Sequence, residues 1–152
     1  MEFIDYLDRT EVEIVRIVEK AGYKIEENTP LCLLGVDYVG FLEKKRKVIV
    51  ICTKNAKRRE GYSLIKKRDK DIFERTALHI KRALRHEAVH VAQECNDGNI
   101  LKIEKNYLIN ISKIKALNGS IKISGEQEKE RQAYILEDKP RLVAKELKKY
   151  CL

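Results

Sequence analysis

The sequence predicts an α+β fold in which an N-terminal helix and a small β-hairpin precede a series of helices. Over most of the chain, apolar residues recur every three or four positions, as they do along one face of a helix. Two runs between residues 31 and 53 are instead short and rich in β-branched residues, which is typical of strands. With 152 residues and 43% apolar content, the chain can form one modest core, so we expect a single domain over residues 1–152.

The first expected helix covers Glu11 to Ala21. Its apolar residues are spaced at helical intervals, Asp8 and Glu11 have the spacing of a capping box, and Gly22 follows the last turn. Both ends of this helix are therefore marked in the sequence.

A β-hairpin is expected next, with strands at Leu31 to Leu42 and Lys47 to Thr53 and a charged turn between them. The second strand contains the run Val48 to Thr53, the strongest strand signal in the chain. We expect its outer edge to pair with an extended substrate peptide, a binding mode in which the peptide adds a strand to a sheet.

A long helix is expected from Phe73 to Cys95. Asp71 and Glu74 indicate a capping box at its start, and the turn Asn96-Asp97-Gly98 marks its end. Its buried face is predicted by apolar residues at helical spacing: Phe73, Ala77, Ile80, Leu84, Ala88, Val91 and Cys95.

This helix carries the motif H-E-x-x-H at His86, Glu87 and His90. Residues four apart lie on one face of a helix, so two imidazoles at this spacing can hold one Zn²⁺ while the glutamate faces the open side of the metal. His86 and His90 are therefore the predicted metal ligands. Glu87 is the predicted general base.

Three further helices are expected after the motif. The first covers Tyr107 to Leu117 and ends at Asn118-Gly119, and the second covers Ser124 to Glu137, where Ser124 and Gln127 have capping-box spacing. The third opens at Pro140, a residue favoured in the first turn of a helix.

A catalytic zinc site commonly has three protein ligands, so one more is needed. The remaining histidine, His79, lies about 10 Å from His86 by helical rise, which is too far to share one ion. The third ligand is therefore expected to be a carboxylate from a later helix, and within 124–137 we favour Glu130.

The two motifs together resemble the glutamate zincins, in particular their compact intracellular and phage-associated members. In these proteins the H-E-x-x-H helix is followed by a helix with E-x-x-A, whose glutamate is the third ligand. Arg85 to Gln93 matches the first pattern and Glu130 to Tyr134 matches the second, so the resemblance covers residues 73–137. It implies a minimal zincin-like fold, a Zn²⁺ cofactor and hydrolysis of protein or peptide substrates.

Two points of the site stay open in the sequence. Forty residues separate His90 from Glu130, a longer spacing than in thermolysin-like enzymes, so Glu126, Asp97 and Asp138 remain alternative third ligands. The reaction also needs a second donor for the developing oxyanion. Tyr134 is our candidate for this catalytic role because it lies four residues after Glu130 on the same helix face; Tyr107 or an arginine are alternatives.

The chain carries a net charge of +8, with basic clusters at Lys44–Lys47, Lys54–Arg59 and Lys66–Lys70. Such clusters can bind nucleic acid, but they fall in expected turns and loops, and no nucleic-acid-binding motif accompanies them. The alternative to a peptidase is thus a basic, nucleic-acid-associated binding protein whose H-E-x-x-H is structural or degenerate.

The remaining expectations concern location and cysteines. The chain has neither an apolar run of 18 residues nor a signal-peptide pattern at its start, so we expect a cytoplasmic protein that does not enter a membrane. Its four cysteines lack C-x-x-C spacing, so we expect buried thiols. In an oxidising compartment, Cys95 could pair with Cys151.

Overall fold

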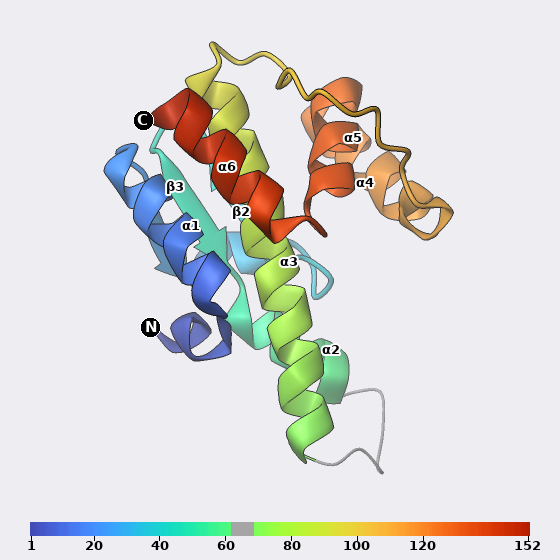
Figure 1. Cartoon of the computed structure of the whole chain (residues 1–152). Helices are drawn as coiled ribbons and strands as arrows, with labels where there is room; N and C mark the ends of the chain where they lie inside the picture. The colour runs from blue at the N-terminus through green and yellow to red at the C-terminus, as the bar shows by residue number, and fades with distance from the viewer. Residues whose placement is uncertain (62–68) are drawn as a thin grey trace.

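The computed structural model describes residues 1–61 and 69–152 and confirms the α+β fold (Figure 1). In Figure 1, α1 and the sheet lie to the left of the long helix α3, and α4 and α5 lie to its right. The helices are α1 (Arg9–Lys20), α2 (Thr53–Gly61), α3 (Asp69–Cys95), α4 (Ile114–Ser124), α5 (Gln127–Leu136) and α6 (Pro140–Cys151); the strands are β1 (Lys24–Glu27), β2 (Gly40–Glu43) and β3 (Val48–Ile51); short 3-10 helices are η1 (Glu2–Tyr6), η2 (Pro30–Leu34) and η3 (Ile111–Lys113).

The sheet has the strand order β1-β3-β2, with β3 antiparallel to β2 and parallel to β1. Alternate residues of β3 face two different apolar clusters: Ile49 and Ile51 join the main core with residues of α1 and α3, while Val48 and Val50 pack with Cys32 and Cys52. The expected hairpin is confirmed. Strand β1 was not expected, because its four residues carry no alternating pattern.

Two details of the hairpin differ from the prediction. Most of the expected first strand is not a strand, because Pro30 begins the 3-10 helix η2 and only Gly40–Glu43 pairs with β3. The outer edge of β3 cannot take a substrate, because both of its edges are paired. The edge of the sheet next to α3 and α4 belongs to β2, so β2 is the strand with which a peptide could pair on this side.

The first helix and the end of the long helix are confirmed. Helix α1 begins after Asp8, although the Asp8 side chain makes no capping hydrogen bond, so the expected capping box is wrong in this detail. Helix α3 begins at Asp69, so Asp71 lies inside the first turn rather than at the cap. It ends where expected, since Asp97 and Gly98 have φ values of 56° and 76° and the Gly98 N–H donates to the Gln93 carbonyl at 2.9 Å.

The helix expected at Tyr107 to Leu117 is wrong. Helix α4 begins seven residues later, runs through Asn118-Gly119 and ends at Ser124, before Gly125, whose φ is 70°. Two of the apolar residues that suggested the earlier start face solvent: Leu108 is 88% exposed and Ile111 is 87% exposed. They form no buried face, so no packing stabilises a helix there.

The last two helices are present with one correction. Ser124 is the final residue of α4 and not the cap of α5, although its hydroxyl accepts a hydrogen bond from the Glu126 N–H at 3.2 Å. Helix α6 begins at Pro140, as expected, and packs against α1 and α3.

All four cysteines form disulfides, so the expectation of buried free thiols is wrong. Cys95 pairs with Cys151 and ties the end of α3 to the end of α6, as the sequence allowed. Cys32 pairs with Cys52 and ties η2 to the end of β3, which was not expected. The Cα atoms of these pairs are 5.2 Å and 5.6 Å apart, within the usual range for disulfides.

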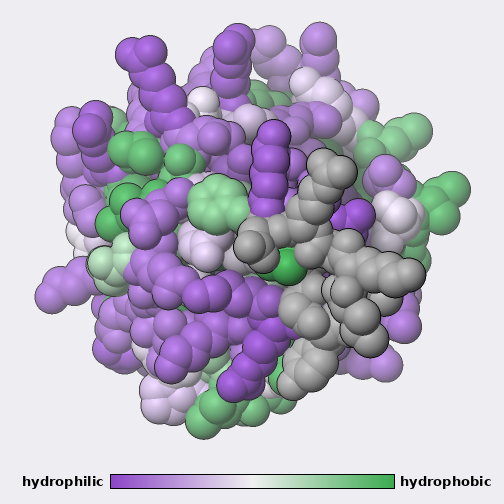
Figure 2. All heavy atoms as spheres, turned by 90° about the horizontal axis from the view of Figure 1, so that it is seen from below, coloured by the Kyte–Doolittle hydropathy of each residue, from purple (hydrophilic) through white to green (hydrophobic). Residues whose placement is uncertain are grey.

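The surface is predominantly polar, as expected from a chain with 37% charged residues. The face in Figure 2 shows apolar side chains in small separate groups among hydrophilic ones. None of the helices in the described ranges is sufficiently long and apolar to cross a membrane.

Candidate metal centre

The two histidines of the motif lie next to each other on α3. Because they are one helical turn apart, His86 and His90 share a face, and their ring centroids are 5.0 Å apart. Both residues are buried, at 8% and 7% exposure. They therefore form the floor of a site shielded from bulk water.

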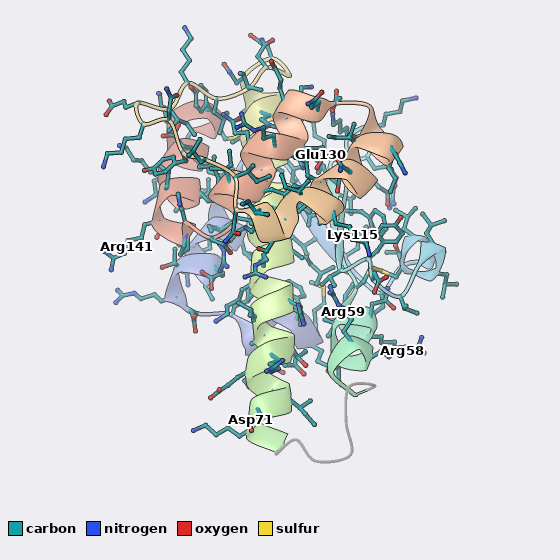
Figure 3. The ribbon with its side chains drawn as sticks, turned by 90° about the vertical axis from the view of Figure 1, so that its right-hand side faces the viewer. Arg58, Arg59, Asp71, Lys115, Glu130 and Arg141 are labelled. Atoms are coloured by element: carbon teal, nitrogen blue, oxygen red, sulfur yellow. A yellow bond between two sulfur atoms is a disulfide. The ribbon has the colours of Figure 1, made fainter. Side chains whose placement is uncertain are left out.

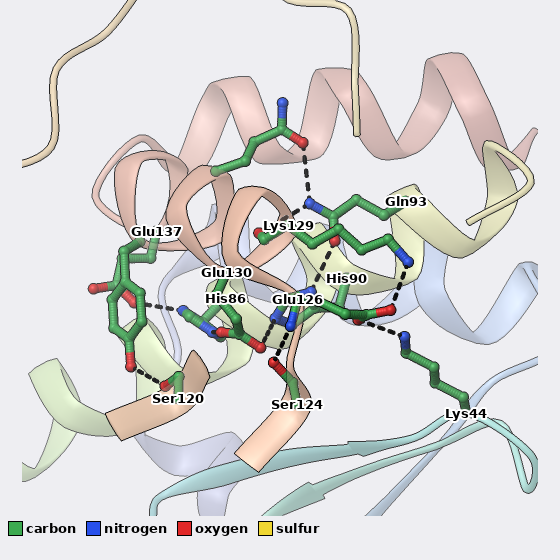
Figure 4. Close-up of polar contacts among 12 residues, drawn as sticks. Lys44, His86, His90, Gln93, Ser120, Ser124, Glu126, Lys129, Glu130 and Glu137 are labelled. Carbon is green, nitrogen blue, oxygen red and sulfur yellow. Dashed lines mark hydrogen bonds and ion pairs between the residues drawn. The ribbon is translucent and has the colours of Figure 1, made fainter. Parts of the chain in front are cut away.

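Glu130 of α5 completes the group. Its Oε2 lies 3.2 Å from the Nε2 of His86, and its Oε1 lies 3.2 Å from the Nε2 of His90 (Figure 4). One ligand atom from each residue lies within 4.8 Å of the others, an arrangement that could hold a metal ion. Figure 3 shows Glu130 on the helix that crosses the upper half of α3. The structure thus brings together the three residues that the sequence predicted as ligands.

Glu137 orients the His86 ring from the outer side. Its Oε2 lies 3.0 Å from Nδ1 of His86, and because a carboxylate only accepts, Nδ1 donates to it. By the same argument Nε2 donates to Glu130 at 3.2 Å, and a metal bound at Nε2 would replace that proton. Glu137 is held in turn by Lys113, whose Nζ lies 2.8 Å from Oε1, and by Arg85, whose Nε donates to the Glu137 carbonyl. This role of Glu137 was not expected, because no motif in the sequence marks it.

The Nε2 atom of His90 is a buried polar atom without a hydrogen-bond partner among the described residues. It lies 3.2 Å from Glu130, but not in hydrogen-bond geometry. Leaving such an atom unsatisfied costs about 1–3 kcal/mol. A metal ion bound by both Nε2 atoms and the Glu130 carboxylate would satisfy it, and nitrogen and oxygen donors of this kind suit zinc. The residues present therefore fit a metal.

The electrostatics of the group favour a bound cation. Burial lowers the pKa of His86, but its hydrogen bonds to Glu130 and Glu137 outweigh this effect and raise the pKa well above its usual value. Burial acts to raise the pKa of Glu130, but the adjacent imidazoles of His86 and His90 hold that pKa far below its usual range. Three carboxylates, those of Glu87, Glu130 and Glu137, surround the histidines, so a positive charge here is stabilised whether a proton or a metal supplies it.

Glu87 lines a pocket of about 330 Å³ together with both histidines and Glu130. Burial raises its pKa, which the neighbouring histidines partly oppose. One wall of the pocket is β2, and Gly40 allows β2 to approach α3 closely: a Cβ atom on Gly40 would lie 3.3 Å from the Cγ of Glu87. The other wall consists of residues of α4 and the start of α5: Ser120, Ile123, Ser124 and Glu126.

Tyr134 lies beside the site with its hydroxyl directed to α4. Its ring contacts the His86 ring edge to face at 4.5 Å, and its hydroxyl lies 2.6 Å from the Ser120 hydroxyl and donates to the Ala116 carbonyl at 3.3 Å. Burial raises the pKa of Tyr134 to about 12, so the hydroxyl stays protonated and able to donate. Its oxyanion role stays a prediction.

The alternative third ligands occupy other positions. Glu126 is paired with Lys44 and Lys129, at 3.1 Å and 3.0 Å. Asp138 is paired with Arg82 at 3.1 Å and with Lys113. Asp97 lies in the turn after α3. Within the described part of the chain, the carboxylate grouped with His86 and His90 is that of Glu130.

Fold and site together define an α+β domain with a buried His-His-Glu group that could hold a metal ion. Residues 3–152 match the family described as Domain of unknown function (DUF8637), and the chain belongs to this family. Searches of the curated proteins and of the solved structures returned no match.

Proposed function

We propose that this protein is a zinc-dependent metallopeptidase of the glutamate zincin type. The observation that carries the proposal is the position of Glu87, which lies between two metal-capable histidines and lines the same pocket as Glu130. Three protein ligands leave a coordination position open, as in catalytic zinc sites, whereas structural sites are closed by a fourth protein ligand. The pocket gives a substrate access to that position.

In the proposed reaction, three residues hold the metal and a fourth transfers the proton. His86, His90 and Glu130 would hold the zinc, which would lower the pKa of a water molecule to about 7 and polarise the scissile carbonyl. Glu87 takes the proton of the attacking water and passes it to the leaving amine. The raised pKa of Glu87 suits the first of these steps, because a carboxylate with a higher pKa is a stronger base toward water.

Strand β2 provides a place for an extended peptide. The Cys52 N–H donates to the Val39 carbonyl at 2.7 Å, and Gly40 is paired with Ile51 in the antiparallel register. Because hydrogen bonds in such a pair alternate along a strand, the backbone groups of Gly40 and Leu42 face away from β3. Both residues line the pocket beside Glu87, so a substrate strand paired with them would place its peptide bond over the site.

The observations favour this proposal over a nucleic-acid-binding protein. Several basic residues of the predicted clusters are neutralised: Lys44 pairs with Glu94 and Glu126, Arg46 with Glu26 and Glu43, and Lys57 with Glu2. Arg58 and Arg141 lie on opposite sides of the molecule in Figure 3. Most of the cluster Lys66–Lys70 lies outside the described residues.

The test compares wild type with Glu87→Gln. The amide keeps the size of the side chain but cannot accept the proton of water, so zinc content should stay near one per chain while hydrolysis of an unstructured protein library falls by a factor on the order of 10² or more. Glu74→Gln, an exposed change on the same helix, should leave both unchanged. Equal chelator-sensitive hydrolysis by wild type and Glu87→Gln would show that Glu87 is not the base. Wild-type protein that cannot be loaded with zinc would refute the metal site itself.

A further inference from the structure

The His90 ring is held by a chain of side-chain amides. Its Nδ1 lies 2.8 Å from the Oε1 of Gln93, and the Nε2 of Gln93 donates to the Oε1 of Gln132 at 3.0 Å and to the Lys129 carbonyl at 3.1 Å. Gln132 of α5 then contacts Leu101, in the segment after α3. Gln93 is 1% exposed, so water does not replace these contacts.

The direction of every hydrogen bond in this chain follows from the backbone of Leu101. Its N–H can only donate and reaches the Oε1 of Gln132 at 2.8 Å, while its carbonyl can only accept and receives the Nε2 of Gln132 at 2.9 Å. The amide of Gln132 can therefore adopt one orientation only. Its Oε1 must then accept from Gln93, and the Oε1 of Gln93 must face His90.

An amide oxygen facing Nδ1 requires that Nδ1 carry the proton, so the neutral ring has its lone pair on Nε2, the atom that faces Glu130. The Lys129 carbonyl, which can only accept, holds the Gln93 amide in the same orientation. We propose that Gln93, held by Gln132 and by the Lys129 carbonyl, is a positioning residue that sets the tautomer and ring orientation of His90 for metal binding. His86 is oriented independently, by Glu137. The proposal rests on the proposed metal site, but the tautomer of His90 is a property of the chain with or without zinc.

The experiment compares Gln93→Leu with Gln132→Leu. The first removes the acceptor of the His90 Nδ1–H, whereas the second removes one contact that holds Gln93 and leaves the other, to the Lys129 carbonyl. Zinc affinity, measured by competition with a chromophoric chelator, should fall on the order of 10- to 100-fold in Gln93→Leu and much less in Gln132→Leu. Equal losses in the two variants would show that the contact with His90 is not what matters and would contradict the proposal. Gln127→Leu, an exposed change on α5, is the control.

Nitrogen NMR of the imidazoles supplies the second readout. In wild type the His90 Nδ1–H resonance should be observed and protected from exchange, and it should be lost in Gln93→Leu while that of His86 persists. Retention of the His90 resonance and of zinc affinity in Gln93→Leu would overturn the proposal. If wild type binds no zinc, the proposed function fails, yet the same comparison of resonances in the metal-free protein still decides the role of Gln93.

Discussion

Gly40 permits the closest approach between β2 and α3, the helix that carries His86 and His90, and Gly40→Ala tests that approach. A Cβ atom at this position would lie 3.2 Å from the Ala83 Cβ, 3.3 Å from the Glu87 Cγ and 3.5 Å from the Ala83 carbonyl oxygen. The first two distances are a few tenths of an ångström shorter than an ordinary contact. Ala83 cannot rotate away, because its Cβ is fixed to the helix backbone. The strand must therefore move outward, or Glu87 must change rotamer.

Overpacking of this kind costs about 1–3 kcal/mol of the free energy of unfolding. For a chain of this size, that corresponds to a fall of roughly 2–10 °C in melting temperature. The rate of hydrolysis should fall by more than the loss of folded protein can explain, because the displaced group is the proposed base or the strand proposed to hold the substrate. Thermal unfolding followed by circular dichroism measures the first effect, and the peptidase assay measures the second.

Gly119→Ala provides a matched control with the opposite sign. Gly119 lies inside α4, and a Cβ atom there meets no heavy atom within 4 Å, so alanine should stabilise the helix by about 0.5–1 kcal/mol. Ala83→Gly alone should cost about 1 kcal/mol, because glycine lies inside a helix there. Combined with Gly40→Ala it should cost less than the sum of the two single changes, which a double-mutant cycle measures as a coupling energy. Wild-type stability in Gly40→Ala would refute the described contact between β2 and α3.

Three further predictions concern the site and the cysteines. Glu130→Ala should reduce zinc retention as much as loss of either histidine, measured by metal analysis, whereas Glu126→Ala should not; the reverse ranking would move the third ligand by one turn. Tyr134→Phe should retain zinc but slow hydrolysis on the order of 10² if the hydroxyl stabilises the oxyanion, and unchanged rates would exclude that role. Protein denatured without reductant in the presence of an alkylating agent should incorporate no alkyl group, as measured by mass; four alkylated cysteines would contradict both disulfides and support the predicted cytoplasmic location, since disulfides are rare in reducing compartments.

The sequence was informative where a signal is local. Two histidines four residues apart on a helix with a marked end, at Asp97 and Gly98, define the floor of the site without any tertiary information. The E-x-x-A pattern located Glu130 for the same reason. Strand β1 was missed because its place in the sheet comes from parallel pairing with β3, a long-range contact that four residues cannot signal.

The false helix at Tyr107 to Leu117 shows the opposite error. Apolar residues at helical spacing predict a helix only if something packs against them, and Leu108 and Ile111 are almost fully exposed. The strand expected over Leu31 to Leu42 is present only from Gly40 onward. The apolar residues before Gly40 belong to η2 and the loop after it, where backbone carbonyls are bound by a side chain rather than by a neighbouring strand: the Asn55 Nδ2 donates to the carbonyls of Cys32, Gly35 and Tyr38.

The face of α5 that meets α3 explains why the candidate ligand Glu130 lies in an E-x-x-A pattern, and it extends that pattern by one turn. Glu130, Ala133 and Glu137 recur at helical spacing and lie on one side of the helix, and Ala133 is fully buried. Its small side chain lets the helices approach until the Glu130 carboxylate reaches both Nε2 atoms and Glu137 reaches the other nitrogen of His86. A larger residue at 133 would separate the helices and withdraw both carboxylates together. The pattern that describes this site is therefore E-x-x-A-x-x-x-E, in which the first glutamate faces the metal position and the second orients the histidine that shares it.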